Sequence, residues 1–157
     1  MEPRLFRKED RPPLEKIIRS VSNFNQMDVS VALELIDDVC EKEERSDYII
    51  YVLEDESKIV RGYVCFGKTP LTESTFDFYW MAIDPSFQGK GIGLHFFQFV
   101  ERQVKQRGAR RLMCETSSLD DYQRVVRLYE KLGYQFVARI RNFYKDGDDK
   151  LIYMKEL

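Results

Sequence analysis

The spacing of hydrophobic residues divides the chain into segments of two kinds. In some segments they recur every three or four positions, as on the buried face of a helix. In others, β-branched and aromatic residues gather in short runs that are typical of strands. Helices are therefore predicted at 12–21, 28–39, 91–107 and 119–132, and strands at 4–7, 48–53, 59–66, 75–83, 111–116, 134–143 and 150–154.

Residues at the ends of these segments indicate how they begin and stop. Pro12 and Pro13 suit the first turn of the first helix, and Asp28 is the expected N-cap of the second. Gly133 stands where the last helix should end, and Asp146-Gly147 is a strong signal for a hairpin turn. The last two strands should therefore be antiparallel neighbours.

The order of the elements predicts an α/β fold with a mixed sheet. A helix lies between the strands at 75–83 and 111–116, and such a crossover implies that these strands run parallel. The length of 157 residues fits one domain, 1–157, which is large enough to bury a core.

A glycine-rich stretch, Ile83 to Gly93, joins the aromatic strand at 75–83 to the helix that follows. Gly89, Gly91 and Gly93 can take φ > 0, so that successive N–H groups point into one hollow that would hold an anion. The N-terminus of the following helix would add to this attraction. The spacing fits neither a Walker A loop nor the dinucleotide fingerprint G-x-G-x-x-G.

Composition and charge narrow the classes of partner and location. The 25 Lys and Arg against 27 Asp and Glu leave a net charge of −2, which predicts neither a nucleic-acid partner nor a membrane surface. The three cysteines are too scattered for a zinc site, so no metal is expected, and they read as reduced thiols. Without an apolar N-terminal leader or spanning segment, we expect a soluble cytoplasmic protein.

Two motifs resemble the GNAT superfamily of N-acetyltransferases. Gln88-x-x-Gly91-x-Gly93, preceded by Ala82-Ile83-Asp84-Pro85, resembles the loop that binds the pyrophosphate of acetyl-CoA. Leu128-Tyr129 and Gly133-Tyr134 resemble the L-Y-x-x-x-G-[FY] ending of the fourth helix of that family. The predicted order of elements also matches the GNAT fold from end to end. The resemblance implies a sheet of about seven strands with four helices, in which two central parallel strands splay apart.

The same resemblance assigns residues to the cosubstrate, acetyl-CoA. Backbone groups near the end of the strand at 75–83 would pair with the pantetheine arm, and the glycine loop would hold the pyrophosphate. Many members carry an Asn seven residues before the tyrosine of the second motif, whereas this chain has Tyr122, for which a contact near the pantetheine and packing at the helix start are the alternatives. The expected cofactor residues are Met81, Ala82, Ile83, Gln88, Gly89, Lys90, Gly91, Ile92, Gly93 and Tyr122.

Three further residues are candidates for the chemistry. Tyr129 matches the tyrosine that faces the thioester sulfur in the family, although a core aromatic would also fit its position. An alkylammonium must lose a proton before it can attack, so a base is expected. Glu115 resembles the base of ribosomal-protein alanine acetyltransferases, and Asp77 the base of histone-type members. We prefer Glu115, and the alternative for either is a solvated or ion-paired carboxylate.

The sequence therefore predicts an acetyl-CoA-dependent N-acetyltransferase that transfers an acetyl group to a primary amine by direct attack. The alternatives are a CoA-binding regulatory module without catalysis and a binder of nucleotide phosphates. The acceptor, an amine of a small molecule, peptide or protein, is not encoded in any motif we can read. A homodimer through an exposed strand is also left open.

Overall fold

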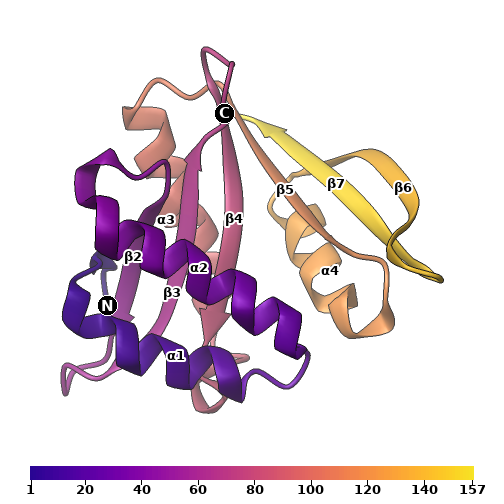
Figure 1. The fold of residues 1–157 in the computed structure, drawn as a ribbon. Helices are drawn as coiled ribbons and strands as arrows, with labels where there is room; N and C mark the ends of the chain where they lie inside the picture. Colours follow the sequence, from indigo (N-terminus) through magenta and orange to yellow (C-terminus); the bar gives the residue numbers. More distant parts are fainter. The chain divides into compact units, whose positions relative to one another are not determined.

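The computed structural model describes all residues from Met1 to Leu157. Seven strands form a mixed sheet in the order β1-β2-β3-β4-β5-β7-β6, which confirms the predicted α/β fold with four helices (Figure 1). The strands are β1 (Arg4–Leu5), β2 (Ile49–Glu54), β3 (Val60–Lys68), β4 (Thr75–Ile83), β5 (Arg111–Ser117), β6 (Gln135–Lys145) and β7 (Asp148–Glu156), and the helices are α1 (Arg11–Ser20), α2 (Gln26–Lys42), α3 (Ile92–Gln106) and α4 (Gln123–Lys131).

The contacts of the chain divide it into two compact units. The first unit comprises Met1–Gly67 and Trp80–Phe99, and the second comprises Lys68–Tyr79 and Val100–Leu157. β4 and α3 each contribute residues to both units.

In the first unit, helices cover both faces of the antiparallel strands. Figure 1 shows α1 and α2 crossing one face of β2 and β3, with α3 behind them. β2 pairs with β1 and β3 in antiparallel register. The core is apolar on both sides of β3, where Tyr63, Val64, Cys65 and Phe66 are fully buried. Because both faces are covered, β3 is apolar at successive positions rather than at alternate ones.

The second helix begins earlier than the sequence pattern suggested. Asn25, not Asp28, is the N-cap, since its side chain accepts a hydrogen bond from the N–H of Asp28 at 2.9 Å. The Asp28 carboxylate accepts one in return from the N–H of Asn25 at 2.8 Å. Asp28 is thus the third helical residue of a reciprocal capping box. Our prediction confused the two partners, because either residue type satisfies an orphan N–H group.

In the second unit, β5 is the central strand. It runs parallel to β4, from Thr75 opposite Arg111 to Phe78 opposite Cys114, as the helical crossover predicts. On its other side β5 pairs with β7 along its whole length, and β7 pairs with β6. The helix predicted at 119–132 is shorter, because a short 3₁₀ helix at Asp120–Tyr122 precedes α4.

The β6–β7 hairpin turns at Asp146-Gly147, as predicted, and Gly147 has φ +80°. Above the turn the register of the two strands shifts between Ile140 and Lys145. Asp149 stabilises this bulge, since its carboxylate accepts hydrogen bonds from the N–H of Asn142, at 2.8 Å, and from Arg139. The hydrogen bond from Asn142 is the first cause that lowers the pKa of Asp149. Asp149 is therefore a structural carboxylate and not a surface charge.

The first strand is anchored by a nearly buried carboxylate. Both terminal nitrogens of Arg4 donate to Asp10 at 2.8 Å, and the N–H of Arg7 donates to the same carboxylate at 2.7 Å. Arg4 also pairs with Glu54 on β2. Burial acts to raise the pKa of Asp10, but the hydrogen bonds from Arg4 and Arg7 outweigh it, so the net pKa is lowered.

We expect Asp10→Asn to lower the free energy of unfolding at pH 7 by about 2–3 kcal/mol, because it leaves Arg4 with an unpaired position. A carboxyl group with a lowered folded pKa stabilises the fold above its unfolded pKa of about 3.9, and this contribution is lost as pH falls through the folded pKa. Urea denaturation should therefore show the largest difference between the variant and the wild type near neutral pH, and this difference should shrink as pH falls below the unfolded pKa. Glu43→Gln, which removes an exposed ion pair with Lys8, is the control. An equal effect of both variants would contradict the role of Asp10.

None of the helices in the structure is both long enough and apolar enough to span a membrane.

Candidate active site

The glycine loop has the backbone conformation of an anion-binding turn. Gly89 and Gly91 have φ of +76° and +80°, in the left-handed region. Gly93 does not, which corrects our prediction for it, because α3 begins at Ile92 and Gly93 is already helical. A side chain at Gly89 or Gly91 would meet no atom within 4 Å. Glycine is thus needed there for its backbone conformation and not for space.

The start of α3 leaves N–H groups without helical partners. The N–H of His95 donates to the carbonyl of Gly91 at 3.0 Å, which closes the first turn. The N–H groups of Ile92, Gly93 and Leu94 precede that bond, so no carbonyl of the helix can accept from them. These donors and the positive end of the helix dipole are the groups that would attract an anion to the loop.

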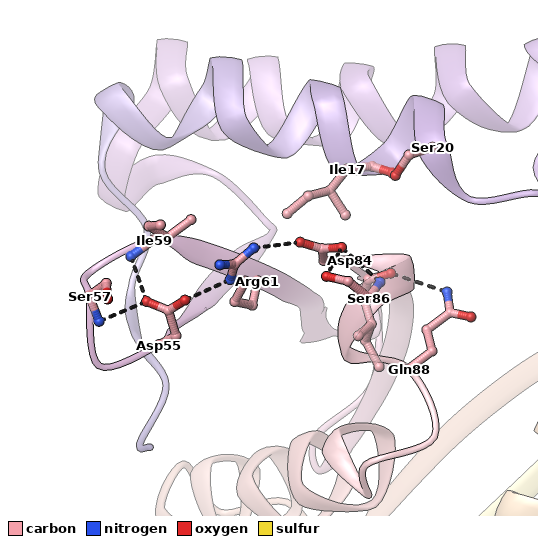
Figure 2. A network of polar contacts seen from close by, with 10 residues as sticks. Ile17, Ser20, Asp55, Ser57, Ile59, Arg61, Asp84, Ser86 and Gln88 are labelled. Atoms are coloured by element: carbon pink, nitrogen blue, oxygen red, sulfur yellow. Dashed lines mark hydrogen bonds and ion pairs between the residues drawn. The ribbon is translucent and has the colours of Figure 1, made fainter.

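Side chains of the first unit hold the loop in place (Figure 2). Arg61 donates to Asp84 at 2.9 Å and to Asp55 at 2.8 Å, which ties the start of the loop to β3 and the β2–β3 turn. The Asp84 carboxylate accepts from the N–H of Ser86 at 2.9 Å, and the side chain of Gln88 donates to the carbonyl of Ile83 at 3.2 Å. The Gln88 side chain therefore braces the loop against the end of β4.

Phe87 gathers two cations beside the loop. The guanidinium of Arg61 lies 4.5 Å from the ring centroid, and the ammonium of Lys90 lies 4.3 Å from it. Arg61 is already paired with two carboxylates, whereas Lys90 contacts the aromatic ring. The charge of Lys90 is therefore better placed to meet an incoming anion than that of Arg61.

The end of β4 lies against a glycine that the sequence analysis did not single out. A Cβ built at Gly62 on β3 would lie 2.8 Å from the carbonyl oxygen of Ala82 and 3.3 Å from both the Cα of Ile83 and the Phe96 ring. Such contacts leave room for glycine alone. Gly62 thus sets the position of two predicted cofactor residues, Ala82 and Ile83. The sequence feature that could have identified it is a glycine inside a predicted strand. Met81, the third, is half-buried on the same strand.

In the second unit, the two candidate bases lie on one face of the sheet. Asp77 is opposite Met113 in the parallel register, and Glu115 is two residues beyond Met113, so all three point to the same side. Asp77 accepts a hydrogen bond from the hydroxyl of Thr69 at 2.6 Å. Glu115 forms an ion pair with Lys150 at 2.6 Å, and its side chain is 49% exposed. Glu115 is thus the more accessible carboxylate and Asp77 the more constrained one.

Lys150 is a neighbour of the site that the motifs did not predict. Lys150 is on β7, opposite Ser117 of β5. Its ammonium pairs with the Glu115 carboxylate and lies 4.5 Å from the centre of the Phe143 ring. The contact between Lys150 and Glu115 could not be predicted from the sequence, because a cross-strand pair depends on a strand register that local patterns do not specify.

Tyr129 contacts Glu115 through the backbone and not through the carboxylate. Its ring is 4% exposed and packs against Tyr134 and Tyr153, and its hydroxyl donates to the carbonyl of Glu115 at 3.0 Å. Burial raises the pKa of Tyr129 well above the usual value of a phenol, so the hydroxyl keeps its proton at neutral pH. The structure thus brings Tyr129 and Glu115 together, with Tyr129 as a hydrogen-bond donor.

Cys114 and Glu115 point to opposite faces of β5, as strand alternation predicts. Cys114 is buried while Glu115 is exposed, and burial raises the pKa of the thiol. A thiol in this state is a poor nucleophile.

Tyr122 ends the short 3₁₀ helix before α4, where its N–H donates to the carbonyl of Leu119 at 2.9 Å. The structure contains no group of three or more His, Cys, Asp or Glu side chains that could hold a metal ion.

Comparisons with known proteins agree with these features. A family model described as an acetyltransferase (GNAT) domain matches residues 46–136, which is more than half of the chain. A crystal structure from Desulfovibrio desulfuricans, of a protein described as a GNAT-family acetyltransferase, is 33% identical, covers 99% of this chain and 98% of that one, and superposes with a TM-score of 0.92. The ribosomal-protein-S18-alanine N-acetyltransferase of Escherichia coli shares the fold, with 18% identity, coverage of 99% and 92%, and a TM-score of 0.77.

A curated relative is similar over a shorter region. The S-(2-succino)cysteine N-acetyltransferase of Bacillus subtilis is 25% identical over 87 residues, which are 54% of this chain. The match spans about half, 53%, of that relative's length. The glycine loop, the sheet order, the family model and the full-length structural match point to the same conclusion. The chain belongs to the GNAT family of acetyltransferases.

Proposed function

We propose that this chain is an acetyl-CoA-dependent N-acetyltransferase that acetylates a primary amine by direct attack, with residues 1–157 acting as one catalytic domain. The glycine loop is the observation that carries the proposal. Two left-handed glycines stand before a helix whose first N–H groups have no helical acceptor. An anion of at least one phosphate fits this set of donors.

The residues present fit the diphosphate of CoA. Gly89, Gly91 and the amides at the start of α3 would donate to the phosphate oxygens, and Lys90 would supply a charge. Ala82 and Ile83, held by the close approach of Gly62, would offer backbone groups to the amides of the pantetheine arm. When bound, acetyl-CoA supplies an acetyl group already activated as a thioester.

The chain must then accept a proton from the amine. We assign this role to Glu115, because its carboxylate is half-exposed while Asp77 is tied to Thr69. The ammonium of Lys150 lies 2.6 Å from the Glu115 carboxylate. An acceptor ammonium carries the same charge, so we propose that it competes with Lys150 for this carboxylate before the proton moves.

Tyr129 is proposed to donate a hydrogen bond to the departing sulfur, as the family resemblance implies. A buried phenol whose pKa is raised stays protonated, which suits a donor at neutral pH. The hydroxyl would have to exchange the carbonyl of Glu115 for the sulfur. Full protonation of the thiolate by Tyr129 is the stronger form of the same assignment.

Direct attack is favoured over a covalent acetyl-cysteine, because none of the three thiols is activated. Burial is the main cause that raises the pKa of Cys40, Cys65 and Cys114. The side chains of Cys65 and Cys114 are buried, whereas Cys40 is half-buried. A nucleophilic cysteine needs the opposite shift, toward thiolate at neutral pH.

The test is thiol release from acetyl-CoA in the presence of amines, with the acetylated product identified by its mass. The panel includes α-amino acids, lysine, polyamines, peptides with free N-termini and S-(2-succino)cysteine, since the B. subtilis relative is named for that acceptor. We expect at least one amine to raise thiol release above hydrolysis. Tight CoA binding in calorimetry without release for any amine would instead indicate a regulatory CoA-binding module. Equal affinity for ATP and CoA would indicate a general binder of nucleotide phosphates.

Two further assignments accompany this proposal. Three free thiols suit the reducing cytoplasm, where we place the protein, and cell fractionation would test this. We also propose a homodimer through β6, an edge strand with exposed Phe136, Val137 and Ile140. A monomeric mass in light scattering would exclude the dimer.

A further inference from the structure

The buried side-chain polar atoms of the first unit that have no hydrogen-bond partner include one donor on β3 and one on β4. The hydroxyl of Tyr63 belongs to a side chain that is 0% exposed, and the indole N–H of Trp80 is also shielded from solvent. A buried donor without a partner is destabilising, so such groups are rare in folded proteins. Their presence on neighbouring strands calls for an explanation beyond packing.

Both donors lie on the side of the sheet that α1 and α2 cover. The Cβ direction of Gly62 meets Phe96 on α3, so the next residue of β3, Tyr63, points to the opposite face. Trp80 is placed by its ring, which makes an edge contact with Phe24, in the connection between α1 and α2, at a centroid distance of 5.4 Å.

The two donors are also close along the strands. The N–H of Asp84 donates to the carbonyl of Arg61 at 2.8 Å, and Gly62 lies against Ile83. This antiparallel register places Tyr63 opposite Ala82, two residues from Trp80. Ala82 is among the residues that we assign to the pantetheine arm, so the donors flank the strand segment expected to carry the thioester.

We propose that the Tyr63 hydroxyl and the Trp80 indole N–H bind a carbonyl or carboxylate oxygen of the acceptor, and so select amines that carry such an oxygen beside the nitrogen. This rests on the proposed function. An indole N–H can only donate, and the phenol offers a second donor, so the matching group is an oxygen acceptor and not another amine. The class selected is amino acids and the N-terminal residues of peptides, and polyamines are disfavoured. The Phe24 ring would form an apolar wall beside this oxygen.

The test compares acceptors that differ only in the carboxylate: leucine with isopentylamine, phenylalanine with phenethylamine, and lysine with cadaverine. The quantity measured is kcat/KM for the amino acid divided by kcat/KM for the amine that lacks the carboxylate. This ratio is determined for the wild type, Tyr63→Phe and Trp80→Phe. Because the amines are the same in all proteins, differences in their basicity cancel between variants. We expect each variant to lower the ratio about 10-fold in favour of the decarboxylated amine. Tyr51→Phe is the control, because the Tyr51 ring contacts Phe99 on the α3 side.

Thermal denaturation separates this role from a structural one. A hydroxyl without a partner contributes nothing that Phe lacks, so Tyr63→Phe should melt at the wild-type temperature or above it. A lower melting temperature with an unchanged ratio would show that the hydroxyl holds a structural water, and would overturn the inference. A wild type that acetylates amines but whose ratio is unaffected by both variants overturns the inference alone. If none of the amines makes the wild type release thiol, the proposed function is overturned and the inference with it.

Discussion

Glu115→Gln is expected to lower kcat by about 100- to 1,000-fold at pH 7, the usual contribution of a positioned general base. The amide has nearly the same shape as the carboxylate but cannot accept the proton of the amine. The affinity for CoA should change less than about 2-fold, because the proposed phosphate donors are backbone groups of the glycine loop. Steady-state kinetics with the best acceptor, together with calorimetry for CoA, measure the two effects separately.

Two matched variants show whether the effect belongs to the base. Glu156→Gln removes another exposed, ion-paired carboxylate, on β7 and paired with Arg111, and should leave kcat unchanged. Lys150→Met breaks the ion pair of Glu115 but keeps the carboxylate, so it should retain most of the activity. If Glu115→Gln and Lys150→Met lose activity equally, the ion pair and not the base is what matters. Unchanged kcat in Glu115→Gln would remove the assignment.

The same assay tests Tyr129. Tyr129→Phe keeps the ring packed against Tyr134 and Tyr153 but removes the donor to the Glu115 carbonyl. We expect kcat to fall by about 10- to 100-fold if the hydroxyl assists the departing thiolate. Acetyl donors with better thiol leaving groups should narrow this difference, which a purely structural hydroxyl would not do. An equal loss with all donors would assign Tyr129 to the fold instead.

Gly91→Ala is expected to weaken CoA binding by about 10-fold or more, because alanine at φ +80° costs roughly 1–2 kcal/mol. The loop can relieve this strain only by rotating the peptide, which turns its N–H away from the phosphate. Space is not the obstacle, since a Cβ at this position meets no protein atom within 4 Å. Calorimetry with CoA and with desulfo-CoA gives the affinity without turnover.

Gly108→Ala is a matched control for this variant. Gly108 follows α3, has φ +82° and also leaves open space for a Cβ, but it lies outside the glycine loop. The two variants should lose similar stability in thermal denaturation, while only Gly91→Ala loses affinity for CoA. Equal affinities in both variants would contradict a phosphate site at the loop.

The sequence located the elements well where the hydrophobic pattern was strong. β4 was predicted at its observed bounds, Thr75–Ile83, because an aromatic run ended by Asp84-Pro85 permits few alternatives. The N-cap of α2 was misplaced because Asn25 and Asp28 satisfy each other's N–H groups. Helix ends depend on such local exchanges, which hydrophobic spacing does not report.

The part of the candidate site that depends on backbone conformation could be predicted, because residue types such as glycine indicate that conformation. Gly89 and Gly91 announced a left-handed turn before a helix, and the structure has that turn. Glu115 was selected by its resemblance to the base of ribosomal-protein alanine acetyltransferases, but its pairing with Lys150 was not foreseen. The burial of the Tyr129 hydroxyl against the Glu115 carbonyl was equally invisible in the chain.

The sequence by itself thus determined the order of elements, the glycine turn and the family, because periodicity, glycine conformations and short motifs are local properties. Only the tertiary structure decided which side chains meet: Lys150 with Glu115, Gly62 against Ala82, and the unpartnered donors of Tyr63 and Trp80 on one face. Such contacts join residues far apart in the chain. They arise from strand register and helix packing, which no local pattern specifies.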